Sequence, residues 1–238
     1  MNTIRLVMVA LALAACGSAA LAARSALVER SYRVGSFDKI VAAGLNHIVV
    51  HTGGAPSVTA YGPAETLDRM EVVIEHGGLQ IRPLRKFRNG SDWRGLKPAT
   101  FSVTMPRVTG ATLAGSGDMR IDRAEGGKFA AVVAGSGNLD VATMRVSEAN
   151  LSMAGSGNLT ARGSAARASL SVAGSGNVRA RGVASRTASV SIAGSGTAEL
   201  TARESADVAI VGSGDALISG PANCHVTRIG SGRAHCNG

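Results

Sequence analysis

Large aromatic side chains are scarce in this chain of 238 residues, which has one Trp, two Tyr and four Phe. So few large side chains cannot fill the broad core of a globular domain of this size. Glycine, in contrast, occurs 31 times, and Ala, Ser and Val are common. Such small side chains suit a narrow core, in which repeated units bury their apolar faces against their neighbours. The composition therefore favours an elongated array.

Long apolar runs are also missing, apart from residues 6–15 near the N-terminus. This run follows a single charge, Arg5, and is too short to span a bilayer, but it fits the apolar region of a secretory signal peptide. We therefore expect an exported bacterial protein, in the periplasm, in the outer membrane or at the cell surface. No other segment is expected to anchor it to a membrane.

The end of this leader can be placed in two ways. The small residues of Ala20-Leu21-Ala22 fit cleavage by signal peptidase, which would remove a signal peptide of residues 1–22. Leu13-Ala14-Ala15-Cys16 resembles a lipobox instead, in which residues 1–15 are removed and Cys16 is lipidated. Both alternatives stay open. Only the second gives the protein a membrane contact, through a lipid anchor.

Cysteine is rare as well, and Cys224 and Cys236 are the only two besides Cys16. In an exported chain such a pair is expected to form a disulfide, which would close the last unit of an array and protect its end. The adjacent His225 and His235 offer zinc as an alternative, but neighbouring residues of a strand point to opposite sides, which hinders convergence on one ion. We predict the disulfide, with free thiols as a further alternative, and no metal site or cofactor.

What the sequence has instead is a Gly-Ser-Gly motif, repeated seven times at intervals of 18 to 20 residues. A fixed period near 20 indicates a repeat architecture. Apolar residues stand four and two positions before the first Gly of each motif, except for Arg228 before the last one, and four and six positions after it, mostly with polar residues between them. This step of two is typical of β-strands with one buried side. The first glycines of the motifs are Gly115, Gly135, Gly155, Gly174, Gly194, Gly212 and Gly230.

These columns predict an all-β fold, namely a right-handed parallel β-helix (β-solenoid) with about seven regular coils of 18 to 20 residues. The solenoid domain is expected over residues 34–238, beginning with an irregular β-rich N-terminal part. Each coil should consist of short strands and turns, with the motif glycines at corners where a Cβ would collide with the next coil or where φ is positive. The Asn residues that follow three motifs are expected to stack as a ladder: Asn138, Asn158 and Asn177.

At this point the sequence resembles the putative autotransporter adhesin, head GIN domain family, whose members carry repeated Gly-Ser-Gly-Asn or Gly-Ser-Gly-Asp motifs. The resemblance extends to the N-terminal half, through residues 37–40, 44–50, 58–60, 79–81 and 101–106. It implies a β-helix fold and an exported location in a bacterium. No catalytic residues come with it.

Enzymatic alternatives find little support in the residues. A serine nucleophile needs one unique site with acid and His partners, whereas seven flanked serines indicate architecture. Calcium-binding repeats need a carboxylate in every turn, but only Asp118 and Asp215 are acidic directly after a motif. A polysaccharide-active β-helix enzyme needs clustered carboxylates, and none occurs in residues 149–198. We predict no enzyme, with this last class as the alternative.

Basic residues outnumber acidic ones by 25 to 16, and they gather in two places. One cluster lies in the acid-free stretch on neighbouring coils; the other, in a long loop of residues 83–98, surrounds Trp93, which could stack on a sugar. We interpret both as sites for anionic envelope glycans, with a solvated charged surface as the alternative. Another envelope protein is a further partner, but nucleic acid is not, because export removes the chain from it. The proposed ligand-binding residues are Arg162, Arg179, Arg181, Arg85, Lys86, Arg88 and Trp93.

We therefore expect a non-enzymatic protein of the cell envelope, which works as an adhesin-like or scaffold binding surface. The expected binding groups are side chains repeated from coil to coil, so the ligand should contact several coils at once.

Overall fold

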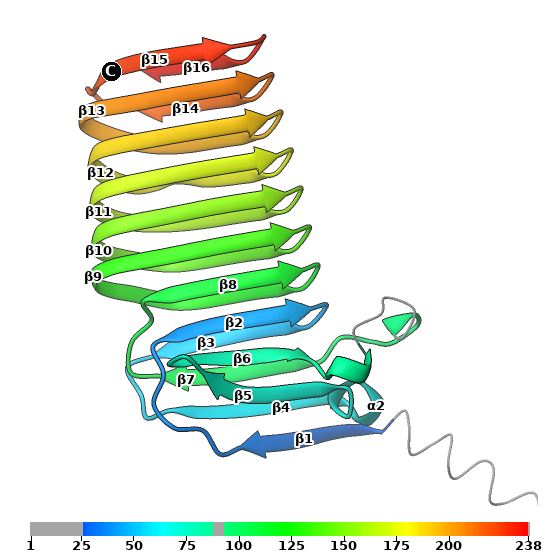
Figure 1. The fold of residues 1–238 in the computed structure, drawn as a ribbon. Coiled ribbons are helices and arrows are strands. Elements are labelled where there is room, and N and C mark those ends of the chain that lie inside the picture. The colour runs from blue at the N-terminus through cyan, green and yellow to red at the C-terminus, as the bar shows by residue number, and fades with distance from the viewer. Residues whose placement is uncertain (1–25, 88–92, 238) are drawn as a thin grey trace, which may run out of the picture.

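The computed structural model describes residues 26–87 and 93–237. It is a stack of flattened coils, built almost entirely from parallel strands, with an irregular β-rich part at the N-terminal end (Figure 1). The prediction of an all-β solenoid with about seven coils is thus confirmed. Within the described residues, no helix is long and apolar enough to cross a membrane.

The regular coils are formed by long strands that each follow one face of the stack, turn, and return along the other. We call the face that follows each motif, such as residues 118–121, the ladder face. The face that precedes each motif, such as residues 130–134, is the plain face. The strands are β8 (Gly110–Gly115), β9 (Asp118–Gly135), β10 (Asn138–Gly155), β11 (Asn158–Gly174), β12 (Asn177–Gly194), β13 (Thr197–Gly212), β14 (Asp215–Ser219), β15 (Asn223–Ile229) and β16 (Arg233–Asn237).

The core is a set of columns running along the stack, because the parallel strands pair in register. On the ladder face, Met119, Leu139 and Leu159 lie in one buried column. On the plain face, Val133 and Met153 share another. Each side chain therefore packs on its equivalents one coil above and below, and a narrow core of small apolar residues is sufficient.

The Gly-Ser-Gly motifs form one edge of the stack, which we call the motif edge. The first Gly of each motif has a φ between +113° and +130°, a region that side chains with a Cβ rarely adopt. In Gly115, Gly135, Gly155 and Gly174 its carbonyl oxygen accepts two hydrogen bonds from the next coil; Gly135, for example, accepts from the backbone N–H groups of Ser156 (2.9 Å) and Gly157 (3.1 Å). A Cβ on Gly155 would collide with the carbonyl of Gly135. The motif thus allows the backbones of adjacent coils to touch.

The opposite edge, which we call the bend edge, differs from the expectation of a separate turn. Each strand from β9 to β13 continues around it without a break. The register between coils shifts only here, for example between Val141 and Met144 and between Ala180 and Ala184. Differences in coil length are therefore absorbed at the bend edge, while the motif edge keeps its register.

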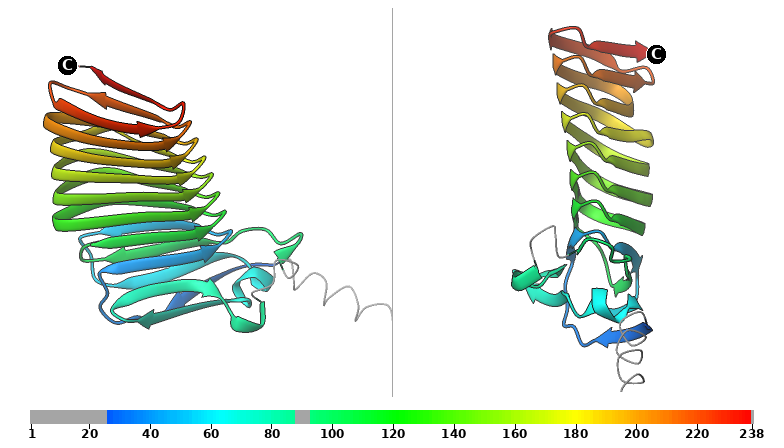
Figure 2. Two further views of the ribbon diagram at one scale, coloured as in Figure 1. Left: turned by 45° about the horizontal axis from the view of Figure 1, so that its top comes forward. Right: turned by 90° about the vertical axis from the view of Figure 1, so that its right-hand side faces the viewer.

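The N-terminal part continues both faces below the first motif (Figure 2). Its two parallel strand pairs complete further coils, and antiparallel strands pair along the bottom of each face. On the plain face, β2 pairs with β8 and β6, and β5 pairs with β6. On the ladder face, β3 pairs with β9 and β7, β4 pairs with β7, and β1 pairs with β4. The bounds are β1 (Leu27–Tyr32), β2 (Lys39–Gly44), β3 (His47–Thr52), β4 (Ser57–Pro63), α2 (Ala64–Leu67), β5 (Met70–Glu75), β6 (Gly78–Pro83), η1 (Arg85–Phe87) and β7 (Thr100–Met105).

An eighth corner, without the motif, lies between β2 and β3. Gly44 has a φ of +108° and stands in register with Gly115, and its carbonyl accepts from the N–H groups of Ser116 and Gly117. The signal was present in the sequence: Ile40 and Ala42 precede this glycine, and Ile48 and Val50 follow it, at the spacing of the apolar columns. This corner was not predicted because Leu45 and Asn46 follow Gly44, where the motif has Ser and Gly.

The last coil consists of β15 on the plain face and β16 on the ladder face. Cys224 and Cys236 are joined there as a disulfide, with their Cα atoms 6.6 Å apart. These residues continue columns that hold Ala206 and Ile218 in the previous coil. The disulfide therefore links the two faces through the core at the bend edge, where earlier coils are closed by a continuous strand.

Candidate functional site

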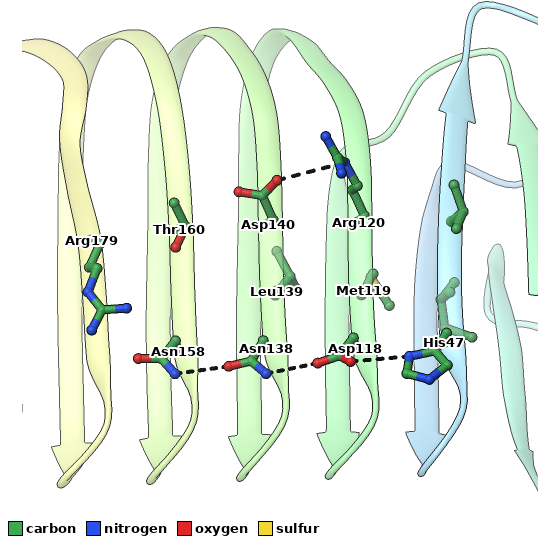
Figure 3. A pocket seen from close by; sticks show the side chains of 12 residues that line it. His47, Asp118, Met119, Arg120, Asn138, Leu139, Asp140, Asn158, Thr160 and Arg179 are labelled. Carbon is green, nitrogen blue, oxygen red and sulfur yellow. Dashed lines mark hydrogen bonds and ion pairs between the residues drawn. The ribbon is translucent and has the colours of Figure 1, made fainter. Parts of the chain in front are cut away.

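A continuous ladder of polar side chains follows the motif edge along the ladder face (Figure 3). The Asp118 carboxylate contacts Nδ1 of His47 at 3.1 Å and accepts a hydrogen bond from Nδ2 of Asn138 at 2.8 Å. Asn158 donates to Oδ1 of Asn138 at 2.9 Å, and Asn177 donates to Oδ1 of Asn158 at 3.1 Å. The three Asn stack as the sequence predicted.

The parallel register is what builds this ladder, because each coil places its residue after the corner directly above the previous one. Every amide donates in the same direction, toward the charged Asp118, so the bonds polarise one another. Each Asn amide also has a second N–H, which the described hydrogen bonds along the ladder leave available to a ligand. The ladder is thus both an inter-coil clamp and a row of donors at the surface.

A second polar column lies two residues further along each strand, and the two columns line a shallow hollow of about 360 Å³. In this column Asp140 lies between two cations from neighbouring coils. Its carboxylate is 4.0 Å from Nε of Arg120 and 3.2 Å from Nη1 of Arg162. Thr160 and Arg179 occupy this column in the next two coils and also line the hollow (Figure 3).

Arg179 differs from the other arginines proposed on the coils. Its side chain is exposed, lines the hollow, and forms no ion pair within the described part of the chain. The in-register acid of the next coil, Glu199, is paired with Arg181 at 3.7 Å instead. Arg179 therefore presents a charge that is free to meet an anion.

The acid-free stretch of the sequence does not become an acid-free patch in space. Its arginines lie one coil away from carboxylates outside the stretch, since residues about 20 apart are neighbours across coils. Four ion pairs arise in this way: Arg162–Asp140, Arg167–Glu148 (3.8 Å), Arg181–Glu199 and Arg186–Glu204 (3.7 Å). Arg162 and Arg181, both predicted to bind a ligand, thus contact acids of the chain itself.

Glu148 at the bend edge is a carboxylate with contacts to three side chains, two of them basic. Lys128 of the previous coil lies 3.0 Å away, and Asn150 donates a hydrogen bond to Oε1 at 3.2 Å. These contacts, with the charge of Arg167, lower the pKa of Glu148 below its usual value. A favoured negative charge here stabilises three adjacent coils rather than offering a catalytic acid.

The basic loop between β6 and β7 projects from the motif edge, at the N-terminal end of the stack (Figure 1). Arg85 and Lys86 are exposed, as are Arg94 and Lys97. Arg82, in contrast, bonds Glu71 and Glu75 across the β5–β6 hairpin, which raises the pKa of Arg82 and lowers that of Glu75.

Trp93 is half-buried against the core, and its Nε1 donates to the carbonyl of Phe87 at 2.7 Å. Its indole therefore supports the loop from inside, with only part of the ring accessible. Arg88 lies outside the described residues, as does Cys16, so the proposals for these two residues stay predictions.

The base of the basic loop adjoins the polar ladder. The N–H of His47 donates to the carbonyl of Ala99, and the buried Asn46 accepts from the N–H of Ala99, both at 2.9 Å. Thr100 then stands in register with His47. With about 4.8 Å per strand, the ladder face from Thr100 to Arg179 measures about 24 Å. Two regions proposed separately from the sequence, the loop and Arg179, therefore lie along the same edge.

The plain face offers little chemistry by comparison. One of its outward columns is serine in three successive coils, Ser152, Ser171 and Ser191, and the column beside it is mainly alanine. Across residues 26–87 and 93–237, no group of three or more His, Cys, Asp or Glu side chains could hold a metal ion.

With the fold and the ladder described, comparison with known proteins defines the class of protein. The chain belongs to the family described as putative auto-transporter adhesin, head GIN domain, which matches residues 36–222. This family comprises surface or envelope proteins of bacteria. A search of curated proteins gave no match.

Among solved structures, a putative adhesin from Bacteroides fragilis is similar, with a TM-score of 0.81, 25% sequence identity, and coverage of 89% of this chain and 97% of that one. A putative lipid binding protein from Parabacteroides distasonis has a TM-score of 0.68 at 22% identity, covering 88% and 96% of the two chains. A putative adhesin from Parabacteroides merdae has a TM-score of 0.69 at 16% identity, with 88% and 95% coverage. The last two share the fold alone.

Proposed function

We propose that the protein is a non-enzymatic adhesin of the cell envelope whose ladder face binds an extended anionic glycan. The observation that carries the proposal is the unbroken polar ladder from His47 to Asn177, flanked by the unpaired charge of Arg179. The family, and the putative adhesin of Bacteroides fragilis, support the general function of adhesion.

The shape of the site favours a chain molecule over a small one. The hollow is shallow and open along the stack, and the same Asn donor recurs in three successive coils, about 4.8 Å apart. A polysaccharide also repeats its hydroxyl groups along its length, so several sugars can form equivalent hydrogen bonds with successive Asn side chains. Many weak, repeated contacts then add up to useful affinity.

Charge provides the preference for an acidic glycan. Arg179 lines one end of the hollow, and the base of the basic loop, which carries the exposed Arg85, Lys86 and Lys97, adjoins the ladder at His47. A uronate, sulfate or phosphate group would meet a cation at either end while its hydroxyl groups contact the amides between them. Arg162 and Arg181 contribute less, because acids of adjacent coils neutralise them.

Polygalacturonate, immobilised beside a neutral glucan, is a suitable probe for the purified chain. We expect binding to the acidic polymer alone, weakened about tenfold between 0.05 and 0.5 M salt, as for a surface charge contact. Arg179→Ala should weaken it about fivefold or more. Arg203→Ala removes another exposed arginine, from β13 and outside the hollow, and should leave binding unchanged.

Two results would overturn the proposal. Equal binding to both polymers, or no difference between Arg179→Ala and Arg203→Ala, would remove the role of the hollow. Release of reducing sugars from polygalacturonate, abolished by a carboxylate variant such as Asp140→Asn, would establish the alternative of a polysaccharide-active enzyme.

A further inference from the structure

The column that forms the polar ladder continues beyond His47 onto two further strands of the N-terminal part. Thr100 of β7 stands in register with His47, and Tyr61 of β4 stands in register with Thr100. Val58 and Ala60 of β4 are buried while Tyr61 is exposed, so Tyr61 points to the same side as the ladder. The column crosses six strand spacings from β4 to β12 and is therefore about 29 Å long.

Tyr61 differs from the rest of this column, which consists of Thr, His, Asp and Asn side chains. It is large and aromatic, and it is 54% exposed. On β1, Leu27 is 59% exposed and stands opposite Pro63, two residues along the same side of β4. Leu27 is therefore a diagonal neighbour of Tyr61, within reach of its ring. The row of donors thus ends, at the motif edge, on an apolar floor.

A sugar chain has the two chemistries that this column presents. The hydroxyl groups at the rim of a pyranose ring form hydrogen bonds with amides, whereas its faces carry C–H groups. The face of an aromatic ring is negative and attracts such weakly positive hydrogens. A tyrosine also supplies a large contact area at a low cost in side-chain entropy. The Asn ladder therefore suits the rim of a sugar, and Tyr61 suits its face.

The charge beside Tyr61 indicates which kind of sugar fits. Glu29 of β1 stands directly opposite Tyr61, with about 5 Å between Cβ atoms in such a pair. It is exposed, and it is the only charged residue on the outer side of β1 and β4, which the structure describes in full. A uronate stacked on Tyr61 would bring a second carboxylate close to Glu29. A neutral sugar avoids this repulsion, and its hydroxyl groups can donate to Glu29.

We propose that Tyr61, flanked by Leu27, is a subsite on which a neutral sugar of the bound glycan stacks. The inference rests on the proposed glycan function and specifies its ligand, as a chain in which neutral sugars accompany acidic ones. The acidic sugars lie along the hollow toward Arg179, and a neutral sugar lies over Tyr61, where Glu29 disfavours an anion. Because the apolar floor continues the column of the ladder, one extended chain can contact both.

Two polymers test the subsite on the purified chain: hyaluronan, in which glucuronate alternates with N-acetylglucosamine, and polygalacturonate, which is acidic throughout. Tyr61→Ala should weaken hyaluronan binding about fivefold, whereas Tyr61→Phe keeps the ring and should stay within about twofold. With polygalacturonate, Tyr61→Ala should change binding by less than about twofold, and Glu29→Gln should strengthen it about threefold. Val211→Ala, at an exposed apolar residue of the plain face, is the control and should change neither.

Loss of hyaluronan binding in Arg179→Ala but not in Tyr61→Ala would overturn the subsite and leave the proposed function intact. So would binding of polygalacturonate alone. Equal losses of both polymers in Tyr61→Ala would overturn the assignment to a neutral sugar, and equal effects of Tyr61→Phe and Tyr61→Ala would overturn stacking. If the unaltered chain bound neither polymer, the subsite and the proposed function would both be wrong. Thermal melts show that each variant compared is folded.

Discussion

At the motif edge a glycine in every coil lets adjacent backbones approach closely, whereas at the bend edge the register shifts and such an approach occurs at single positions such as Gly163, where a Cβ would meet the carbonyl of Met144. From Gly115 to Gly174, the carbonyl of each first motif glycine accepts two hydrogen bonds from the next coil, and no Cβ fits between. At the bend edge the register shifts from coil to coil, and Lys128, Glu148 and Arg167 connect three coils by charge. One edge demands a fixed sequence and the other tolerates variation.

This difference explains why the candidate glycan site adjoins the motif edge. A ligand that contacts several coils needs its donors at a constant spacing, and only the motif edge keeps them in register. The ladder of Asn138, Asn158 and Asn177 starts directly after the corner, where the backbone is held most firmly. Rigid support of this kind lowers the entropy cost of binding.

The strongest test of the comparison is alanine at three glycines. Gly155→Ala at the motif edge adds a Cβ that meets the carbonyl of Gly135 at a residue with φ +129°, and should cost about 4 kcal/mol from clash and strain together. Gly126→Ala at the bend edge has φ +121° but open space, and should cost about 1–2 kcal/mol. Gly127 has neither a positive φ nor a close neighbour, so Gly127→Ala should change the free energy of unfolding by no more than about 0.5 kcal/mol.

Thermal and denaturant unfolding followed by circular dichroism would measure all three. If Gly155→Ala and Gly126→Ala were equally destabilising, backbone strain alone would account for the motif. The close approach of the coils would then not be what requires glycine.

A test of intermediate size concerns the last coil, the one coil whose bend edge is closed by a disulfide. Reduction, or the double change Cys224→Ser with Cys236→Ser, should destabilise this coil by about 3 kcal/mol, as expected for a crosslink that closes a loop of this length. Hydrogen exchange should therefore rise in β15 and β16 first and leave β9 to β11 protected. Intact mass of the purified chain, two hydrogens below the reduced value, checks the bond directly.

A uniform rise in exchange along the whole stack would contradict this assignment. It would mean that the solenoid unfolds as one unit, so that the disulfide does not act on the terminal coil alone.

The sequence predicted the motif edge far better than the bend edge. Gly115 and its equivalents, the buried columns and the Asn ladder follow from a period of two within a period near 20, which depends only on residues close in the chain. The ion-pair partners of Arg162 and Arg181 could not be predicted in this way. Asp140 and Glu199 lie about 20 residues away in the sequence and become neighbours only after the coils are placed in register.

The N-terminal part shows the same limit. The corner at Gly44 could have been found by its columns, but the order of β6, β7, β4 and β1 beneath it could not, because antiparallel and parallel pairings there follow from contacts between distant segments. Likewise, Trp93 was expected to face a ligand. Its bond to the carbonyl of Phe87 depends on how the loop folds back on itself.

The smallest expected effect lies in the charges of the bend edge. Glu148→Gln removes the acid between Lys128 and Arg167 but keeps the side-chain shape, and at low salt should lower Tm by about 1–3 °C. Since the folded protein lowers the pKa of Glu148, its contribution is present above the ordinary pKa of Glu and is lost as the pH falls through the lowered value. The two proteins should thus differ at pH 7 and converge in acid or in about 1 M salt. A difference that persisted under both conditions would assign Glu148 a packing role, and the bend edge would then resemble the motif edge more closely than its charges indicate.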